Sequence, residues 1–196
     1  MWAVRVTLLA ALACLGNEAG TLSEPSALKN SGFAPKIQYY RISGSTREEI
    51  RRALQTHGPV DQFGIHRHAA VDWKIAWSWP KAEDGRPRID QISCRQDITI
   101  ILPQWESEPT APPELITAWN QYYNRLARHE AQHVLHVVDN YPAVEREIRA
   151  ALEINPALTF AEANKTGHAV LNRIRDLDLA YDEVTQHGRL EGISWD

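Results

Sequence analysis

Residues 72–79 alternate between apolar and polar positions, which is the period of a half-buried β-strand. The apolar positions of this run are Trp73, Ile75, Trp77 and Trp79. A row of aromatic rings can serve as a platform for a ligand, but rings at strand spacing more often fill a core. We therefore expect the tryptophan face of this strand to pack inside the protein.

Two other runs indicate strands. Residues 37–44 are β-prone, and residues 98–102 place three large aliphatic side chains on one face before Pro103. A sheet with one apolar face needs a second layer to cover it. The rest of the chain supplies helices for that layer, so we expect a small antiparallel sheet.

A short helix is predicted directly after the first strand. Ser45 is a suitable N-terminal cap, and Glu48 three positions later completes a capping box. Gly58 and Pro59 then stop the helix. His57 falls in its last turn, where we expect it to interact with the helix end rather than bind a ligand.

Helical periodicity dominates the second half of the chain. Pro112 and Pro113 open a long helix, a second helix spans residues 142–154, and a third runs from a Thr159–Glu162 capping box to Gly188. The inward stripe expected of the first is Leu115, Trp119, Tyr122, Leu126, His129, His133 and Val137. That of the third is Phe160, Ala163, Gly167, Val170, Ile174, Leu177, Tyr181 and Val184. We therefore predict an α+β domain whose small antiparallel sheet packs against three helices.

The first long helix contains the pattern H-E-x-x-H, formed by His129, Glu130 and His133. Two histidines four residues apart leave the same helix face and can bind one metal ion, with the glutamate within reach of a water on that ion. Zinc hydrolysis needs this combination of a Lewis acid and a proton-accepting carboxylate. Because both histidines continue the inward stripe, we predict a zincin-like site rather than two hydrogen-bonded core histidines.

The third zinc ligand must come from another part of the chain. On a continuous helix His136 lies about 10 Å along the axis from His129, so we interpret it as a cleft-wall residue or a residue behind the ligands. The helix end at residues 181–188 is unusually polar. His187 in its last turn is the preferred third ligand, and Asp182, Glu183 and His136 are the alternatives.

Two residues of the same segment are assigned supporting roles. Tyr181 has a phenol hydroxyl that can stabilise an oxyanion. We therefore predict that Tyr181, like Glu130, is a catalytic residue. Asp182 can accept a hydrogen bond from an imidazole that binds the metal and so fix its orientation.

The N-terminal residues predict export. Residues 1–19 combine Arg5, a short apolar run and small residues, as a signal peptide does, and no later segment can span a bilayer. Ala11–Cys14 also matches a weak lipoprotein box, in which Cys14 would be acylated. We expect a linker at 20–36, one domain at 37–196, and a secreted or periplasmic protein whose only remaining thiol is Cys94.

Length and charge narrow the class of protein. The 196 residues suit a single core. The net charge is −4 and there is no long basic run, so nucleic acid is not an expected partner.

Several segments, taken in order, carry a resemblance to a known family. They are YYRISGST (39–46), HGP (57–59), the tryptophan strand, LPQW (102–105), HEAQH (129–133) and YDEVTQHG (181–188). The chain resembles a bacterial family catalogued as a domain of unknown function and described as secreted zinc-dependent proteases. That family commonly has glycine where Gln132 stands, a difference that affects only local packing. The resemblance implies a zinc hydrolase but no particular substrate.

We therefore expect a zinc metallopeptidase that hydrolyses a peptide or a cell-envelope amide through a zinc-activated water, with Glu130 as general base. The rival hypothesis is a non-catalytic envelope binding or assembly module that uses a structural zinc. Such a zinc would have four protein ligands and no open position. The presence of Glu130 favours the hydrolase, because a structural site has no use for that carboxylate.

Overall fold

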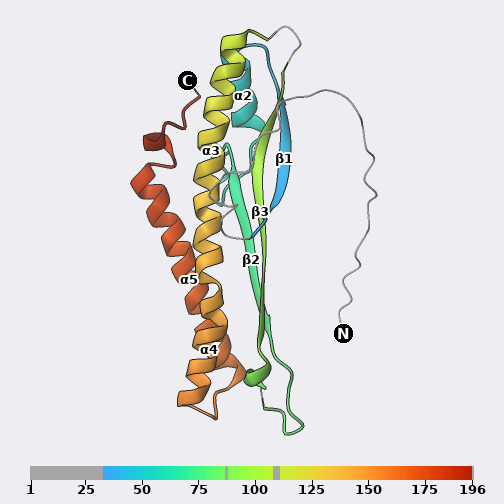
Figure 1. The fold of residues 1–196 in the computed structure, drawn as a ribbon, viewed down its shortest axis with the longest axis vertical. Coiled ribbons are helices and arrows are strands. Elements are labelled where there is room, and N and C mark those ends of the chain that lie inside the picture. Colours follow the sequence, from blue (N-terminus) through green and yellow to red (C-terminus); the bar gives the residue numbers. More distant parts are fainter. Residues whose placement is uncertain (1–32, 87, 108–110, 196) are drawn as a thin grey trace, which may run out of the picture.

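The computed structural model describes residues 33–86, 88–107 and 111–195 (Figure 1). The predicted signal peptide, Cys14 and most of the predicted linker lie outside these residues. The elements in chain order are β1 (Lys36–Ser43), α2 (Arg47–His57), β2 (Ala70–Ser78), β3 (Ser93–Glu106), α3 (Pro113–Asn140), α4 (Pro142–Ile154) and α5 (Phe160–Thr185). Short 3-10 turns lie at Ile89–Gln91 and Arg189–Glu191.

The three strands form one sheet in the order β1-β3-β2. β2 pairs antiparallel with β3, as expected, but β1 pairs parallel to β3, so the sheet is mixed. The alternation of side chains specifies which face of a strand is buried, but it carries no information on strand direction. The α+β class, with three helices packed on a small sheet, is confirmed.

The tryptophan face of β2 is partly buried and packs against the core, as predicted. The indole nitrogen of Trp77 donates to Asn164 Oδ1 at 2.9 Å, and Trp79 stacks on Phe160 with ring centroids 5.7 Å apart. A Cβ at Gly167 would lie 2.6 Å from the Trp77 ring, so only glycine permits this approach of α5 to the strand. These contacts fix α5 relative to the sheet.

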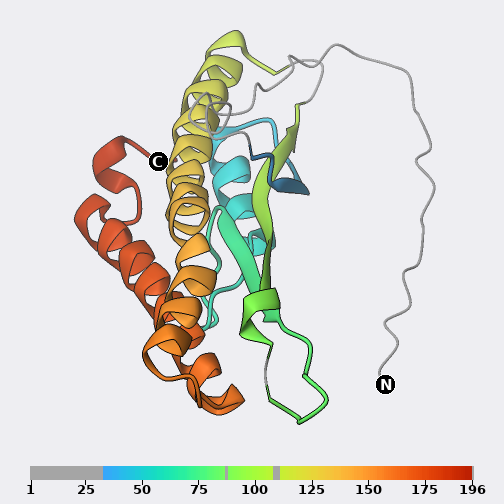
Figure 2. The same ribbon diagram turned by 60° about the horizontal axis from the view of Figure 1, so that its bottom comes forward.

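Helix α3 buries every position of its predicted stripe. α5 then folds back along α3, so its C-terminal end lies beside the middle of α3 (Figures 1 and 2). The chain reverses through α4, whose predicted bounds are confirmed. This arrangement brings the segment at 178–191 to the helix that carries the H-E-x-x-H pattern. Within the described part of the chain, no helix is long and apolar enough to cross a bilayer.

Two helix boundaries differ from the sequence-based prediction. The cap of α2 is Thr46 with Glu49, one residue after the predicted pair, because two overlapping capping-box patterns occur there. The Thr159–Glu162 box of α5 is confirmed, but this helix ends at Thr185 rather than near Gly188. Gln186 and His187 both have φ of 53° and Gly188 has φ of 80°, so three successive left-handed residues end the helix.

Candidate metal centre

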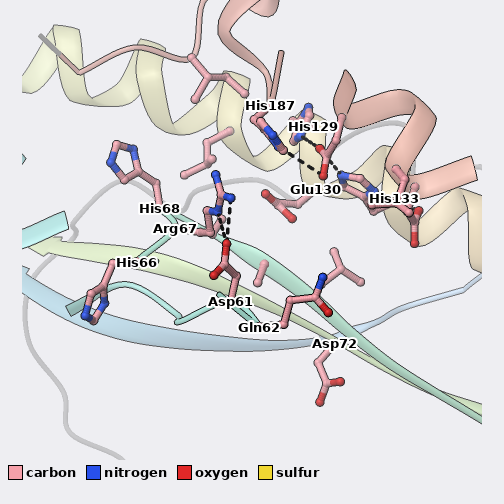
Figure 3. Close-up of a pocket in the computed structure, with 18 of the residues that line it drawn as sticks. Asp61, Gln62, His66, Arg67, His68, Asp72, His129, Glu130, His133 and His187 are labelled. Atoms are coloured by element: carbon pink, nitrogen blue, oxygen red, sulfur yellow. Dashed lines mark hydrogen bonds and ion pairs between the residues drawn. The ribbon is translucent and has the colours of Figure 1, made fainter. Parts of the chain in front are cut away.

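Three side chains from two helices converge between α3 and α5. Figure 3 labels the two that α3 contributes, His129 and His133. His129 and His133 are buried on the inner face of α3. The Nε2 atom of His129 lies 3.2 Å from Asp182 Oδ1, and the Nε2 atom of His133 lies 3.3 Å from the same oxygen. Two imidazole nitrogens and a carboxylate oxygen therefore meet at one point, as ligands of a single cation do.

Asp182 reaches this point because the inner face of α5 changes from apolar to acidic. The prediction placed Leu177 and Val184 inward, but they are 42% and 74% exposed. After the buried Ile174, the inner positions step by four to Asp178 and Asp182. The sequence-based stripe followed the apolar residues, whereas the turns that face the histidines carry carboxylates.

The other nitrogen of each imidazole also contacts a carboxylate. His129 Nδ1 lies 2.7 Å from Glu191 Oε2, and His133 Nδ1 lies 3.0 Å from Asp178 Oδ1. A metal ion at the point shared with Asp182 would need the lone pair of each Nε2, so the remaining proton of each ring would lie on Nδ1, where Glu191 and Asp178 can accept it. The two outer carboxylates therefore suit both rings to bind a metal through Nε2.

Tyr181 supports the Glu191–His129 contact. Its hydroxyl donates to Glu191 Oε1 at 2.7 Å, and its ring stacks on the His129 ring with centroids 4.8 Å apart. Burial is the main cause of the raised pKa of this phenol, and the hydrogen bond to Glu191 adds to it. The predicted oxyanion role of Tyr181 would require the hydrogen bond to Glu191 to break.

Asp178 joins three side chains. Its Oδ1 atom lies 3.0 Å from His133 Nδ1 and 2.9 Å from His136 Nδ1, and its Oδ2 atom accepts from Trp73 Nε1 at 3.3 Å. His136 thus belongs to a second group of potential ligands, with His133 and Asp178, and not to the group that contains His129. As the helical spacing predicted, neither group of potential ligands found within the described residues contains all three histidines of α3.

His187, the preferred third ligand, does not reach the histidine pair. The side chain is 61% exposed, and its Nδ1 atom lies 3.5 Å from the outer oxygen, Oδ2, of Asp182. α5 ends two residues before His187, whose side chain lines the cavity, and Glu183 is exposed. Of the alternatives weighed, the structure places Asp182 against both imidazoles. The fold-back of the third helix, on which the His187 prediction rested, is confirmed.

Glu130 lies beside this group and is only 6% exposed. Within the described residues its carboxylate makes no hydrogen bond, and it faces the cavity shown in Figure 3. Burial raises the pKa of Glu130 to about 7, although the neighbouring His133 and His129 lower it. No buried side-chain oxygen of the described residues lacks a partner, so the Glu130 carboxylate oxygens are open to the cavity.

The charges around the histidines are strongly acidic. Burial lowers the pKa of His133, but hydrogen bonds to Asp178 and Asp182 outweigh burial and raise that pKa to about 10. Burial alone would raise the pKa of Asp182. Contacts with His129 and His133 lower it by more, so the net pKa of Asp182 is well below its usual range. An excess of carboxylates around two imidazoles favours any bound cation.

A cavity of about 840 Å³ opens beside these residues. One wall is the segment 61–72, which enters β2, and the other comes from α3, α5 and Ile193. Figure 3 shows Arg67 and Asp61 on one wall opposite His187 and Glu130 on the other. The cavity is large enough for several residues of a peptide.

Comparisons with known proteins identify the family. Residues 37–188 match the model of the family described as "Bacterial protein of unknown function (DUF922)". The chain belongs to this family. Searches of curated proteins and of solved structures found no match.

The DUF922 match includes most of the site but not all of it. His129, Glu130, His133, Asp178 and Asp182 lie inside the matched range, whereas Glu191 follows its end. The sequence analysis missed Asp178 and Glu191. Asp178 precedes Asp182 by one helical turn and could have been found by extending the inner face of α5 at steps of four. Glu191 lies in a 3-10 turn, where no periodic signal exists.

Proposed function

We propose that this protein is an exported zinc-dependent peptidase in which Glu130 is the general base. The observation that carries the proposal is the position of the Glu130 carboxylate. It is buried, has no hydrogen-bond partner within the described residues, and opens on a substrate-sized cavity beside three convergent ligands. A structural site has no need of such a group.

The donor set fits zinc. Bonds of about 2.0–2.1 Å in a tetrahedral shell separate neighbouring ligand atoms by roughly 3.3 Å. The two Nε2 atoms lie 3.2 and 3.3 Å from Asp182 Oδ1, so little movement is needed to bind the ion. When bound, zinc would polarise the substrate carbonyl and lower the pKa of water.

The residues of the chain then divide the remaining work. His129, His133 and Asp182 hold the metal, and Glu130 takes a proton from the water that attacks the carbonyl carbon. As the C–N bond breaks, Glu130 passes this proton to the leaving nitrogen. The products are a carboxylic acid and an amine, so a peptide and a cell-envelope amide are both suitable substrates.

The number of ligands supports a peptidase over an assembly module with a structural zinc. Each group of potential ligands in the described part of the chain holds three residues, whereas a structural zinc takes four. The group of His133, His136 and Asp178 is less suited to catalysis, because His136 does not line the cavity. Asp178 is better explained as the residue that orients His133.

Metal removal tests the proposed function. The purified mature protein, loaded with zinc, should cleave internally quenched peptides from a mixed-sequence library. Treatment with a chelator should abolish cleavage, and added zinc should restore it, because the three ligands supply no activated water without the ion. Cleavage that persists after complete zinc removal would contradict the proposal, and so would a zinc-loaded protein that cleaves neither peptides nor envelope amides.

A separate prediction concerns Asp178 as a positioning residue. Asp178→Asn should weaken zinc binding by about 10- to 100-fold, because the amide no longer fixes the tautomer and orientation of His133. Affinity is measured by competition with a chromophoric chelator. Asp176→Asn, an exposed change on the same helix, is the matched control and should leave the affinity unchanged. Equal zinc affinities for the two variants would show that Asp178 does not position a metal ligand.

A further inference from the structure

A rigid turn forms one rim of the cavity at residues 60–66. Val60 and His66 form an antiparallel bridge, and Asp61 N donates to Ile65 O at 2.9 Å. Asp61 Oδ1 accepts from the backbone nitrogens of Phe63 and Ile65, each at 2.9 Å. Arg67 Nε donates to the other oxygen, Asp61 Oδ2, at 2.9 Å. One carboxylate thus holds the turn in a single shape.

Three apolar side chains of this turn face water, beside the polar Gln62. Val60, Phe63 and Ile65 are 59%, 75% and 51% exposed, and Phe63 lines the same cavity as Glu130. Leu179 also lines this cavity and is 64% exposed. Exposed apolar side chains grouped on a built structure generally mark a binding surface. The fixed backbone of the turn means that Phe63 is presented at little entropic cost.

The wall between this turn and Glu130 suits an extended chain. Ala69, Ala70 and Val71 line the cavity and lead into β2. β2 is an edge strand, paired only with β3 within the described residues. The backbone groups on its outer edge can accept a peptide in extended conformation.

We propose that Phe63 and Leu179 form a specificity subsite that takes an apolar side chain of an extended peptide substrate, next to the scissile bond. This inference rests on the proposed peptidase function and assigns its substrate class. Both residues line the cavity that holds Glu130, so an apolar side chain of a bound peptide can remove part of their exposed surface from water.

The test compares peptides that differ at one residue beside the cleaved bond. The residue beside the cleaved bond is leucine, phenylalanine or serine. Phe63→Ser should lower kcat/KM on the order of tenfold for the peptides with leucine or phenylalanine there, mainly through KM, and should change it little for the peptide with serine. Phe63→Leu should restore most of the loss. Ile154→Ser is the matched control, since Ile154 is 86% exposed on α4 and does not line the cavity. It should have no effect on any peptide.

A binding measurement separates failure of the subsite from failure of the peptidase proposal. Fluorescein-labelled peptides with a central leucine, serine or aspartate are titrated against zinc-loaded Glu130→Gln protein, with and without Phe63→Ser. We expect the leucine peptide to bind most tightly and to lose about tenfold in affinity with the second change. This result would support the subsite even if the parent protein cleaved nothing. Equal affinities for the three peptides, or a Phe63→Ser change that affects them all alike, would overturn it.

Discussion

Glu130→Gln protein is expected to retain its zinc and its fold but to lose hydrolysis by roughly 10²- to 10⁴-fold, because an amide cannot take a proton from water. The Glu130 carboxylate makes no hydrogen bond within the described residues and opens on the cavity, so its replacement by a neutral amide of the same shape should not lower the melting temperature. The measurements are kcat on the best peptide, the zinc content and a thermal melt.

The matched control for this change is Asp139→Asn, which removes an exposed carboxylate from the same helix. It should leave kcat, zinc content and melting temperature unchanged. Undiminished turnover by Glu130→Gln protein would contradict the assignment of the base. Loss of zinc from this variant would instead make Glu130 a ligand, which the geometry does not support.

The second large effect concerns metal binding. His133→Ala and Asp182→Ala should each reduce bound zinc from about one per chain to a small fraction, because each removes one of three protein ligands. His187→Ala should retain zinc, since His187 contacts only the outer oxygen of Asp182. Zinc content is measured by mass spectrometry after dialysis. If His187→Ala loses zinc and Asp182→Ala keeps it, the third ligand is His187, as the sequence first indicated.

The helix that carries the histidines was predictable because its information is local. Burial of α3 repeats every three or four residues without interruption, and the H-E-x-x-H pattern lies within that repeat. The tryptophan alternation of β2 was readable for the same reason. In both elements the residues that decide the structure are neighbours along the chain.

The unpredicted parts depend on tertiary contacts. The parallel pairing of β1 with β3 follows from the path of the chain through α2, which the alternation does not encode. α5 ends at Thr185 because Gln186 and His187 adopt left-handed conformations, which their residue types do not predict. That end places His187 on the cavity wall, against Asp182 Oδ2, and brings Glu191 to His129.

The third ligand shows the limit of apolar periodicity. Asp182 looked like a supporting residue because the predicted stripe followed Leu177 and Val184, which are exposed. The inner face instead continues through the acidic Asp178 and Asp182, since the surface it meets is the histidine pair of α3. Asp178 and Asp182 face inward because they contact the histidines of α3. Those histidines lie far away in sequence, so the apolar period of α5 does not reveal the contact.

Zinc K-edge X-ray absorption spectroscopy of the zinc-loaded protein reports which atoms bind the metal. We expect a shell with two imidazole nitrogens, from His129 and His133, and oxygen ligands that include the Asp182 carboxylate. Asp182→Ala protein should lose this signal, and Glu130→Gln protein should retain it. A shell with three imidazoles, or one filled entirely by four protein ligands, would contradict the account.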